Sequence, residues 1–199
     1  MRRGILYGIG AYVIWGVLPI YWKQLQGVGA LEILTNRMVW SLVFCVLLLT
    51  AQRNWSWISE ALHSGRTVMT LMGAAALLTV NWGVYIWAVN AGFIIETSLG
   101  YFINPLVNVL LGVLLLNERL RWGQWAAVGV AAAGVLYLTI AYGRPPWIAL
   151  ALAFTFAFYG LLKKQARLPA LEGLTLETAL MTPLALFYLG WLQSQGNAA

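Results

Sequence analysis

The chain has 199 residues, of which 61% are hydrophobic and 9% are charged, and its mean hydropathy is +0.77. A soluble domain carries about 25% charged residues because water must wet its surface, so this composition excludes a water-soluble globular protein. The net charge of +6 needs no nucleic-acid partner, because the positively charged inner loops of a membrane protein account for it.

Long apolar runs without charges predict helices that cross a membrane. A helix needs about 20 apolar residues to span the hydrocarbon core, and in lipid its backbone polar groups must bond within the helix. We therefore expect an all-α, polytopic transmembrane helix bundle with about seven spans. The spans are predicted near residues 4–22, 32–51, 69–91, 94–116, 122–142, 147–163 and 175–192.

The positions of lysine and arginine predict the orientation, because inner loops are enriched in these residues. With the N-terminus inside, the outer segments hold only Lys23 and Arg144, and Arg37 is not counted because it lies within the second span. The inner segments hold nine basic residues: Arg2, Arg3, Arg53, Arg66, Arg119, Arg121, Lys163, Lys164 and Arg167. We therefore expect a cytoplasmic N-terminus.

Along the first two predicted spans, Arg37 is the main functional candidate. It lies about one turn inside the second span, where a cation can pair with an anionic solute or with a fixed carboxylate such as Glu32. Alternatively, its long side chain reaches the membrane interface. Cys45 is the single cysteine, and the chain has no aspartate, so we expect no metal site.

The third predicted span carries Asn81, Trp82 and Tyr85, with Asn81 and Tyr85 one turn apart. Aromatic and amide groups together suit a planar or amphipathic solute. The alternative is ordinary helix packing, in which the amide bonds to a neighbouring helix.

In the fourth predicted span, Tyr101, Asn104 and Asn108 share one helix face. Pro105 removes a backbone hydrogen bond and is expected to kink the helix. A polar stripe beside a kink suits a substrate cavity, and it equally suits hydrogen bonding between helices. Glu96, at the start of this span, either caps the positive end of the helix dipole or acts as a titratable coupling group.

The fifth predicted span has small residues at small-xxx-small spacing, such as Gly123 and Ala127, which allows helix backbones to approach closely. It is interpreted as a packing scaffold or a pairing surface. No enzyme or phosphate-binding motif is present, so we expect neither enzymatic activity nor a cofactor.

A weak internal repeat links the two ends of the chain. Lys23-Gln24 followed by ALEILT (30–35) recurs as Lys164-Gln165 followed by ALEGLT (170–175). Five predicted spans lie in each period, and an odd number inverts the second copy, as in many secondary transporters. We expect a first five-helix repeat over 1–143 and an incomplete second repeat over 144–199, which stops after two helices.

The stretch ETSLGYFINPL (96–106) resembles the signature of the RarD group of the EamA-type transporters, in the drug/metabolite transporter superfamily. Further similar stretches are WGVLPIYWK (15–23), ALEIL (30–34), RMVWS (37–41), NWGVYIWAVN (81–90), NERL (117–120), LTLET (174–178) and PLA (183–185). The resemblance implies ten helices in two inverted halves of five, a central cavity and alternating access in a bacterial inner membrane.

Two hypotheses for the function remain open at this point. The first is a lipid-embedded permease for a small organic solute, either a metabolite or a drug. The second is a truncated, non-transporting fragment or a half-transporter, which assembles as a homodimer or with a complementing half-chain.

Overall fold

The computed structural model describes residues 2–25, 27–143, 145–166 and 168–196. Within these ranges a few side chains are not described, namely those of Arg2, Arg3, Tyr12, Trp15, Leu18, Pro19, Trp22, Lys23, Glu60, Leu116 and Tyr142. Five of the basic residues that predict the orientation have side chains outside the described part: Arg2, Arg3, Lys23, Arg144 and Arg167.

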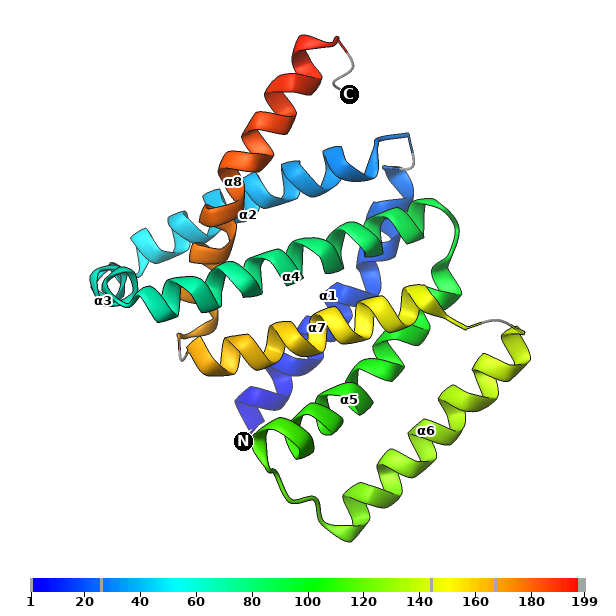
Figure 1. Cartoon of the computed structure of the whole chain (residues 1–199). Helices are drawn as coiled ribbons and strands as arrows, with labels where there is room; N and C mark the ends of the chain where they lie inside the picture. Colours follow the sequence, from blue (N-terminus) through cyan, green and yellow to red (C-terminus); the bar gives the residue numbers. More distant parts are fainter. Residues whose placement is uncertain (1, 26, 144, 167, 197–199) are drawn as a thin grey trace. The chain divides into compact units, whose positions relative to one another are not determined.

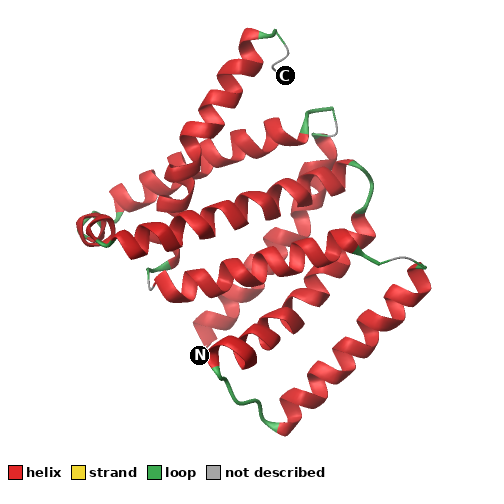
Figure 2. Ribbon diagram, in the orientation of Figure 1, coloured by secondary structure: helices red, strands yellow, loops and turns green. Residues whose placement is uncertain are grey.

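Every regular element among the described residues is an α-helix (Figure 2), which confirms the all-α prediction. The helices are α1 (Arg2–Gln24), α2 (Ala30–Ala51), α3 (Trp57–His63), α4 (Gly65–Asn90), α5 (Ile94–Leu116), α6 (Trp122–Tyr142), α7 (Trp147–Ala166) and α8 (Ala170–Ser194). Six of them, α2 and α4 to α8, are long and apolar enough to cross a membrane. The helix α1 coincides with the first predicted span.

Several predicted boundaries are wrong by up to five residues. The helix α4 starts at Gly65 rather than at residue 69, because the Ser64 side chain caps it by accepting a hydrogen bond from the Thr67 amide (3.3 Å). The helix α8 starts at Ala170 rather than at 175, directly after Pro169. In addition, the interval between the second and third predicted spans contains the short helix α3.

The chain forms two compact units, and each is described separately. Among the described residues, the first unit contains the helix α1 and the segment up to Gly29. In the second unit, helices α2, α4, α7, α5 and α6 lie side by side in that order, and each packs on the next (Figure 1). The helix α8 packs on α2 and α4.

The centre of the second unit is the contact between α5 and α7. Here Leu99, Ile103 and Val107 of α5 are buried against three alanines of α7, Ala149, Ala153 and Ala157. Both sets recur every four residues, which is the spacing of ridges that fit into the grooves of a facing helix. The alanines leave room for the larger side chains, so the two helices pack closely.

Buried positions of α2 recur in α8 at a distance of 140 residues. Both helices begin with an alanine, Ala30 and Ala170. The pairs buried in both copies are Glu32 and Glu172, Ile33 and Gly173, Thr35 and Thr175, Met38 and Thr178, and Cys45 and Ala185. This correspondence supports the repeat, while the division into five-helix halves stays a prediction.

Among the six helices long and apolar enough to cross a membrane, α6 differs from the rest because none of the described residues in its span is buried. A Cβ atom added at Gly123, Gly129 or Gly134 would meet no described atom within 4 Å. The close packing predicted from the small residues is therefore not made within the described part of the chain. Apart from the half-buried residues, such as Val135, that face the α5–α7 core, α6 exposes an apolar surface, which suits a lipid environment.

Candidate functional site

Four of the predicted site residues come together from three helices. The guanidinium carbon of Arg37, on α2, lies 3.9 Å from the ring centroid of Trp82 on α4. The rings of Tyr85, on α4, and Tyr101, on α5, form an edge-to-face pair with centroids 6.1 Å apart. Arg37 lies within electrostatic reach of both tyrosines. We call these four residues the Arg37 cluster.

The local structure explains how the Arg37 cluster forms. Arg37 is seven residues beyond the start of α2, about 10 Å along the helix axis at 1.5 Å per residue. Trp82 and Tyr85 are three residues apart on α4 and therefore lie on one face. A guanidinium stacked on an indole is stabilised by about 0.5–2 kcal/mol, so Trp82 provides Arg37 with a partner inside the bundle.

A small cavity adjoins Trp82 between α2, α4 and α8. Its lining comes from all three helices: Met38, Ala75, Leu78, Thr79, Trp82, Glu177, Thr178 and Met181. The cavity has a volume of about 10 Å³, which is about the room that one water molecule needs. Pockets for small-molecule ligands measure roughly 300–1,000 Å³, so the helices must separate before an organic solute can enter.

A second polar cluster, which the sequence analysis missed, borders the same cavity. The carboxylate of Glu177 on α8 is 1% exposed, and its Oε1 atom lies 2.9 Å from the Nζ atom of Lys163 on α7. The Tyr159 hydroxyl, also on α7, donates a hydrogen bond to the Oε2 atom of Glu177 (3.1 Å). We call these three residues the Glu177 triad.

Glu177 was overlooked because the predicted span began at residue 175, which placed the carboxylate at a helix end. In the structure Glu177 is seven residues inside α8, and α7 continues for three residues beyond Lys163, where the predicted span ended. Pro169 was the available signal, because proline is common at the first positions of helices and marked the true start.

Asn81 lies beside the Arg37 cluster in sequence, but its side chain serves the contact between α4 and α7. Its amide nitrogen donates to the Leu152 carbonyl (2.9 Å) and to the Thr155 hydroxyl (2.8 Å). The residue is buried. This geometry matches the packing alternative for Asn81.

Asn104 and Asn108 bond to one another rather than to the Arg37 cluster. The Asn108 amide donates to the side-chain oxygen of Asn104 (3.0 Å), and Asn108 is exposed. Pro105 lies between them within the continuous helix α5. Glu96 is the third residue of α5 and is 2% exposed. The carboxylate that was expected to cap the helix dipole is therefore buried and does not lie at the surface.

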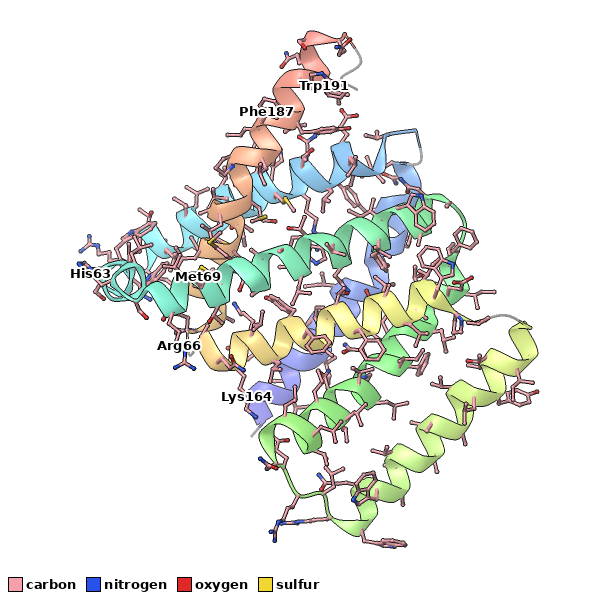
Figure 3. The ribbon with its side chains drawn as sticks, viewed as in Figure 1. His63, Arg66, Met69, Lys164, Phe187 and Trp191 are labelled. Carbon is pink, nitrogen blue, oxygen red and sulfur yellow. The ribbon has the colours of Figure 1, made fainter. Side chains whose placement is uncertain are left out.

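Charged residues mark one end of the second unit. Arg66, at the start of α4, and Lys164, near the end of α7, lie at this end, and Phe187 and Trp191 extend along α8 away from it (Figure 3). Lys164 also donates to the Oε1 atom of Glu118 (2.7 Å). This contact joins the end of α7 to the segment that follows α5.

The amino-acid sequence of the chain is similar to those of bacterial transporters. Residues 2–140 match the model of the EamA-like transporter family. A protein RarD of Streptomyces exfoliatus is 53% identical over 99% of this chain and 62% of its own length. The uncharacterized transporter YojE of Bacillus subtilis is 47% identical over 94% of this chain and 64% of its own length.

A more distant relative is the chloramphenicol-sensitive protein RarD of Pseudomonas aeruginosa, which is 35% identical over 98% of this chain and 67% of its own length. The chain thus spans somewhat less than two thirds of the length of the first two relatives. No solved structure matches the chain. Together with the six apolar helices, the bacterial relatives identify a multi-pass protein of a bacterial inner membrane.

Proposed function

Because the chain belongs to the EamA-like transporter family, we propose that it is a permease that moves a small organic solute across the membrane by alternating access. The observation that carries this proposal is the Arg37 cluster, which groups a cation and three aromatic rings within the membrane-spanning region. Ionisable residues inside the membrane are costly and commonly mark the path of a substrate.

The chemistry of the Arg37 cluster suggests the class of solute. A guanidinium binds carboxylate or phosphate groups through paired hydrogen bonds, and aromatic rings bind planar or apolar surfaces. We therefore propose an amphipathic solute that carries an anionic group beside a planar or apolar part. Tyr85 and Tyr101 supply hydroxyl groups that bind its polar atoms.

The cavity beside Trp82 supports the proposed mechanism. Its lining includes residues of α2 and α8, the two helices that occupy corresponding places in the internal repeat. Substrate sites of inverted-repeat transporters lie at the interface of the repeats near the bilayer midplane. Since about 10 Å³ admits no organic solute, opening this cavity requires α2, α4 and α8 to move apart.

Flux measurements in sealed membrane vesicles test the proposal. Vesicles from cells that express the complete gene are supplied with a panel of radiolabelled amphipathic anions, together with chloramphenicol because one relative is named for sensitivity to it. We expect solute-dependent flux for at least one anionic member of the panel. Absence of flux across the whole panel contradicts the proposed function.

A pair of arginine variants tests the role of the Arg37 cluster. Removing the charge in R37Q should reduce flux at least about tenfold, the effect expected when one charged hydrogen bond of roughly 1.5 kcal/mol or more is lost. The matched control is R66Q, which removes an exposed arginine at the start of α4 and should leave flux unchanged. Equal flux in R37Q and the unmodified protein contradicts a substrate role for Arg37.

A further inference from the structure

Two neighbouring lysines of α7 make ion pairs in very different surroundings. Lys164 and Glu118 are 63% and 49% exposed, whereas Lys163 and Glu177 are 19% and 1% exposed. An exposed pair contributes about 0–1 kcal/mol to stability. Burying a carboxylate costs several kcal/mol, which its partners must offset. Stabilisation alone therefore does not explain why this ion pair is buried.

The position of Glu177 places its charge within the membrane-spanning part of α8. It is seven residues beyond Ala170, about 10 Å along the helix axis. Lys163 lies in the last turn of α7, three residues from its end, and its side chain is 19% exposed. The Glu177 triad therefore joins the last turn of α7 to the lining of the cavity beside Trp82.

The two carboxylate oxygens of Glu177 differ in their bonding. Oε2 accepts the Tyr159 hydroxyl. Oε1 lies 2.9 Å from the Lys163 ammonium, with which it forms an ion pair. Each carboxylate oxygen has two lone pairs, so Oε1 can still bind a proton beside Lys163.

Glu177 is the carboxylate in the lining of the cavity. The groups around it come from α7, α4, α2 and α8 itself. From α7 the neighbours are Tyr159 and Lys163. The helix α4 lines the cavity with Thr79 and Trp82, which do not titrate near neutral pH. The α2 helix contributes Arg37 beyond the Trp82 ring and Cys45 beside Thr175. On α8 itself, Glu172 accepts a hydrogen bond from Asn54 (2.7 Å) and belongs to the helix end.

We propose that Glu177 is the site at which this transporter binds a proton and couples it to the cavity beside Trp82. The proton adds to Oε1 and converts the carboxylate into a neutral acid. Lys163 keeps its own proton and loses its counter-ion, so its flexible side chain turns toward the nearby end of α7. The contact between α7 and α8 is then weakened where α8 lines the cavity. Only the coupling to solute movement rests on the proposed transport function; proton binding does not.

Infrared difference spectroscopy tests proton binding directly, with the purified full chain in lipid. Spectra are compared between about pH 5 and pH 8, a range that separates protonated from ionised carboxyl groups near neutrality. We expect a carbonyl band of a protonated carboxylic acid at the lower pH, and we expect E177Q to abolish it. The matched control is E118Q, which removes the exposed glutamate paired with the neighbouring lysine and should retain the band.

Absence of the band in the unmodified protein, or its persistence in E177Q, overturns the assignment. A second variant covers the case in which E177Q does not fold. Because the Tyr159 hydroxyl donates to Glu177, Y159F should shift the carbonyl band to higher frequency. An unshifted band in Y159F also contradicts the assignment.

Transport assays separate this proposal from the proposed function. If the protein moves solute, E177Q should lose accumulation driven by a pH gradient, whereas E118Q, at the exposed pair, should keep it. Gradient-driven accumulation that survives in E177Q refutes the coupling role while the permease function stands. If no solute moves in the unmodified protein, the permease proposal fails, and the infrared result still decides whether Glu177 binds a proton.

Discussion

Individual polar residues in this protein have different roles although they share a residue type. Asn81 is buried and bonds to two acceptors on another helix. Asn108 is exposed and bonds to Asn104 one turn away on the same helix. Only Asn81 therefore connects two helices, α4 and α7, so the two asparagines should respond differently to substitution.

We predict that N81A lowers the free energy of unfolding by about 1–2 kcal/mol, because hydrogen bonds between membrane helices contribute up to about that much and the Leu152 carbonyl and Thr155 hydroxyl lose their donor. The control N108A should change it by less than about 0.5 kcal/mol. Unfolding in mixed detergent micelles measures both values. An N81A variant as stable as N108A contradicts the role given to Asn81.

At the scale of helices, the contact between α5 and α7 depends on a small residue at the crossing. A Cβ atom added at Gly100 of α5 would lie 3.2 Å from the Ala149 carbonyl oxygen and 3.2 Å from the Leu152 Cβ atom on α7. The carbonyl belongs to the backbone, so relieving this contact requires a shift of the helix and not of a flexible side chain. By contrast, Gly129 of α6 has no described neighbour within 4 Å.

We predict that G100A destabilises the protein by about 1–3 kcal/mol, the usual cost of overpacking. The same substitution at the open position, G129A, should be neutral or stabilise by up to about 1 kcal/mol, because alanine favours a helix over glycine. Thermal unfolding followed by circular dichroism compares the two variants. Equal melting temperatures for G100A and G129A are inconsistent with a tight α5–α7 crossing.

For the second unit as a whole, the charged end defined by Arg66 and Lys164 (Figure 3) predicts which side faces the cytoplasm. Five membrane-spanning helices, α4 to α8, separate His63 from Gln195. Since five is odd, these two residues should lie on opposite sides of the membrane. The positive-inside rule places His63 in the cytoplasm.

Cysteine labelling checks this orientation, because the single native cysteine, Cys45, is 2% exposed. A membrane-impermeant maleimide applied to intact cells should label Q195C and not H63C, and applied to inside-out vesicles it should label H63C. The unmodified chain should remain unlabelled until it is denatured. The reversed pattern would refute the cytoplasmic N-terminus, and labelling of both variants from one side would refute the count of five spans.

Residues with local signals could be singled out from the sequence, although their role as a substrate site stays a prediction. Arg37, Trp82, Tyr85 and Tyr101 were each identified as polar or aromatic groups within apolar runs, and the structure groups them. The role of Asn81 was left between a cavity and a helix contact, because its spacing along α4 is compatible with either. Glu177 was missed because its helix was predicted to start five residues too late.

The amino-acid sequence by itself determined the class of this protein and the number and type of its long helices. The physical reason is local: a long apolar run in lipid must satisfy its backbone polar groups within itself, and helix formation does so without reference to other segments. Composition and helix length therefore sufficed to predict α2 and α4 to α8.

Only the tertiary structure decided which polar groups face one another. The contacts from Glu177 to Lys163 and Tyr159, and from Arg37 to Trp82, depend on how far each helix is rotated and where it crosses its neighbour. Those quantities are determined by side-chain packing between helices, as in the alanine ridge of α7 against α5. No periodicity along a single helix specifies them, because it defines a face but not the helix that covers it.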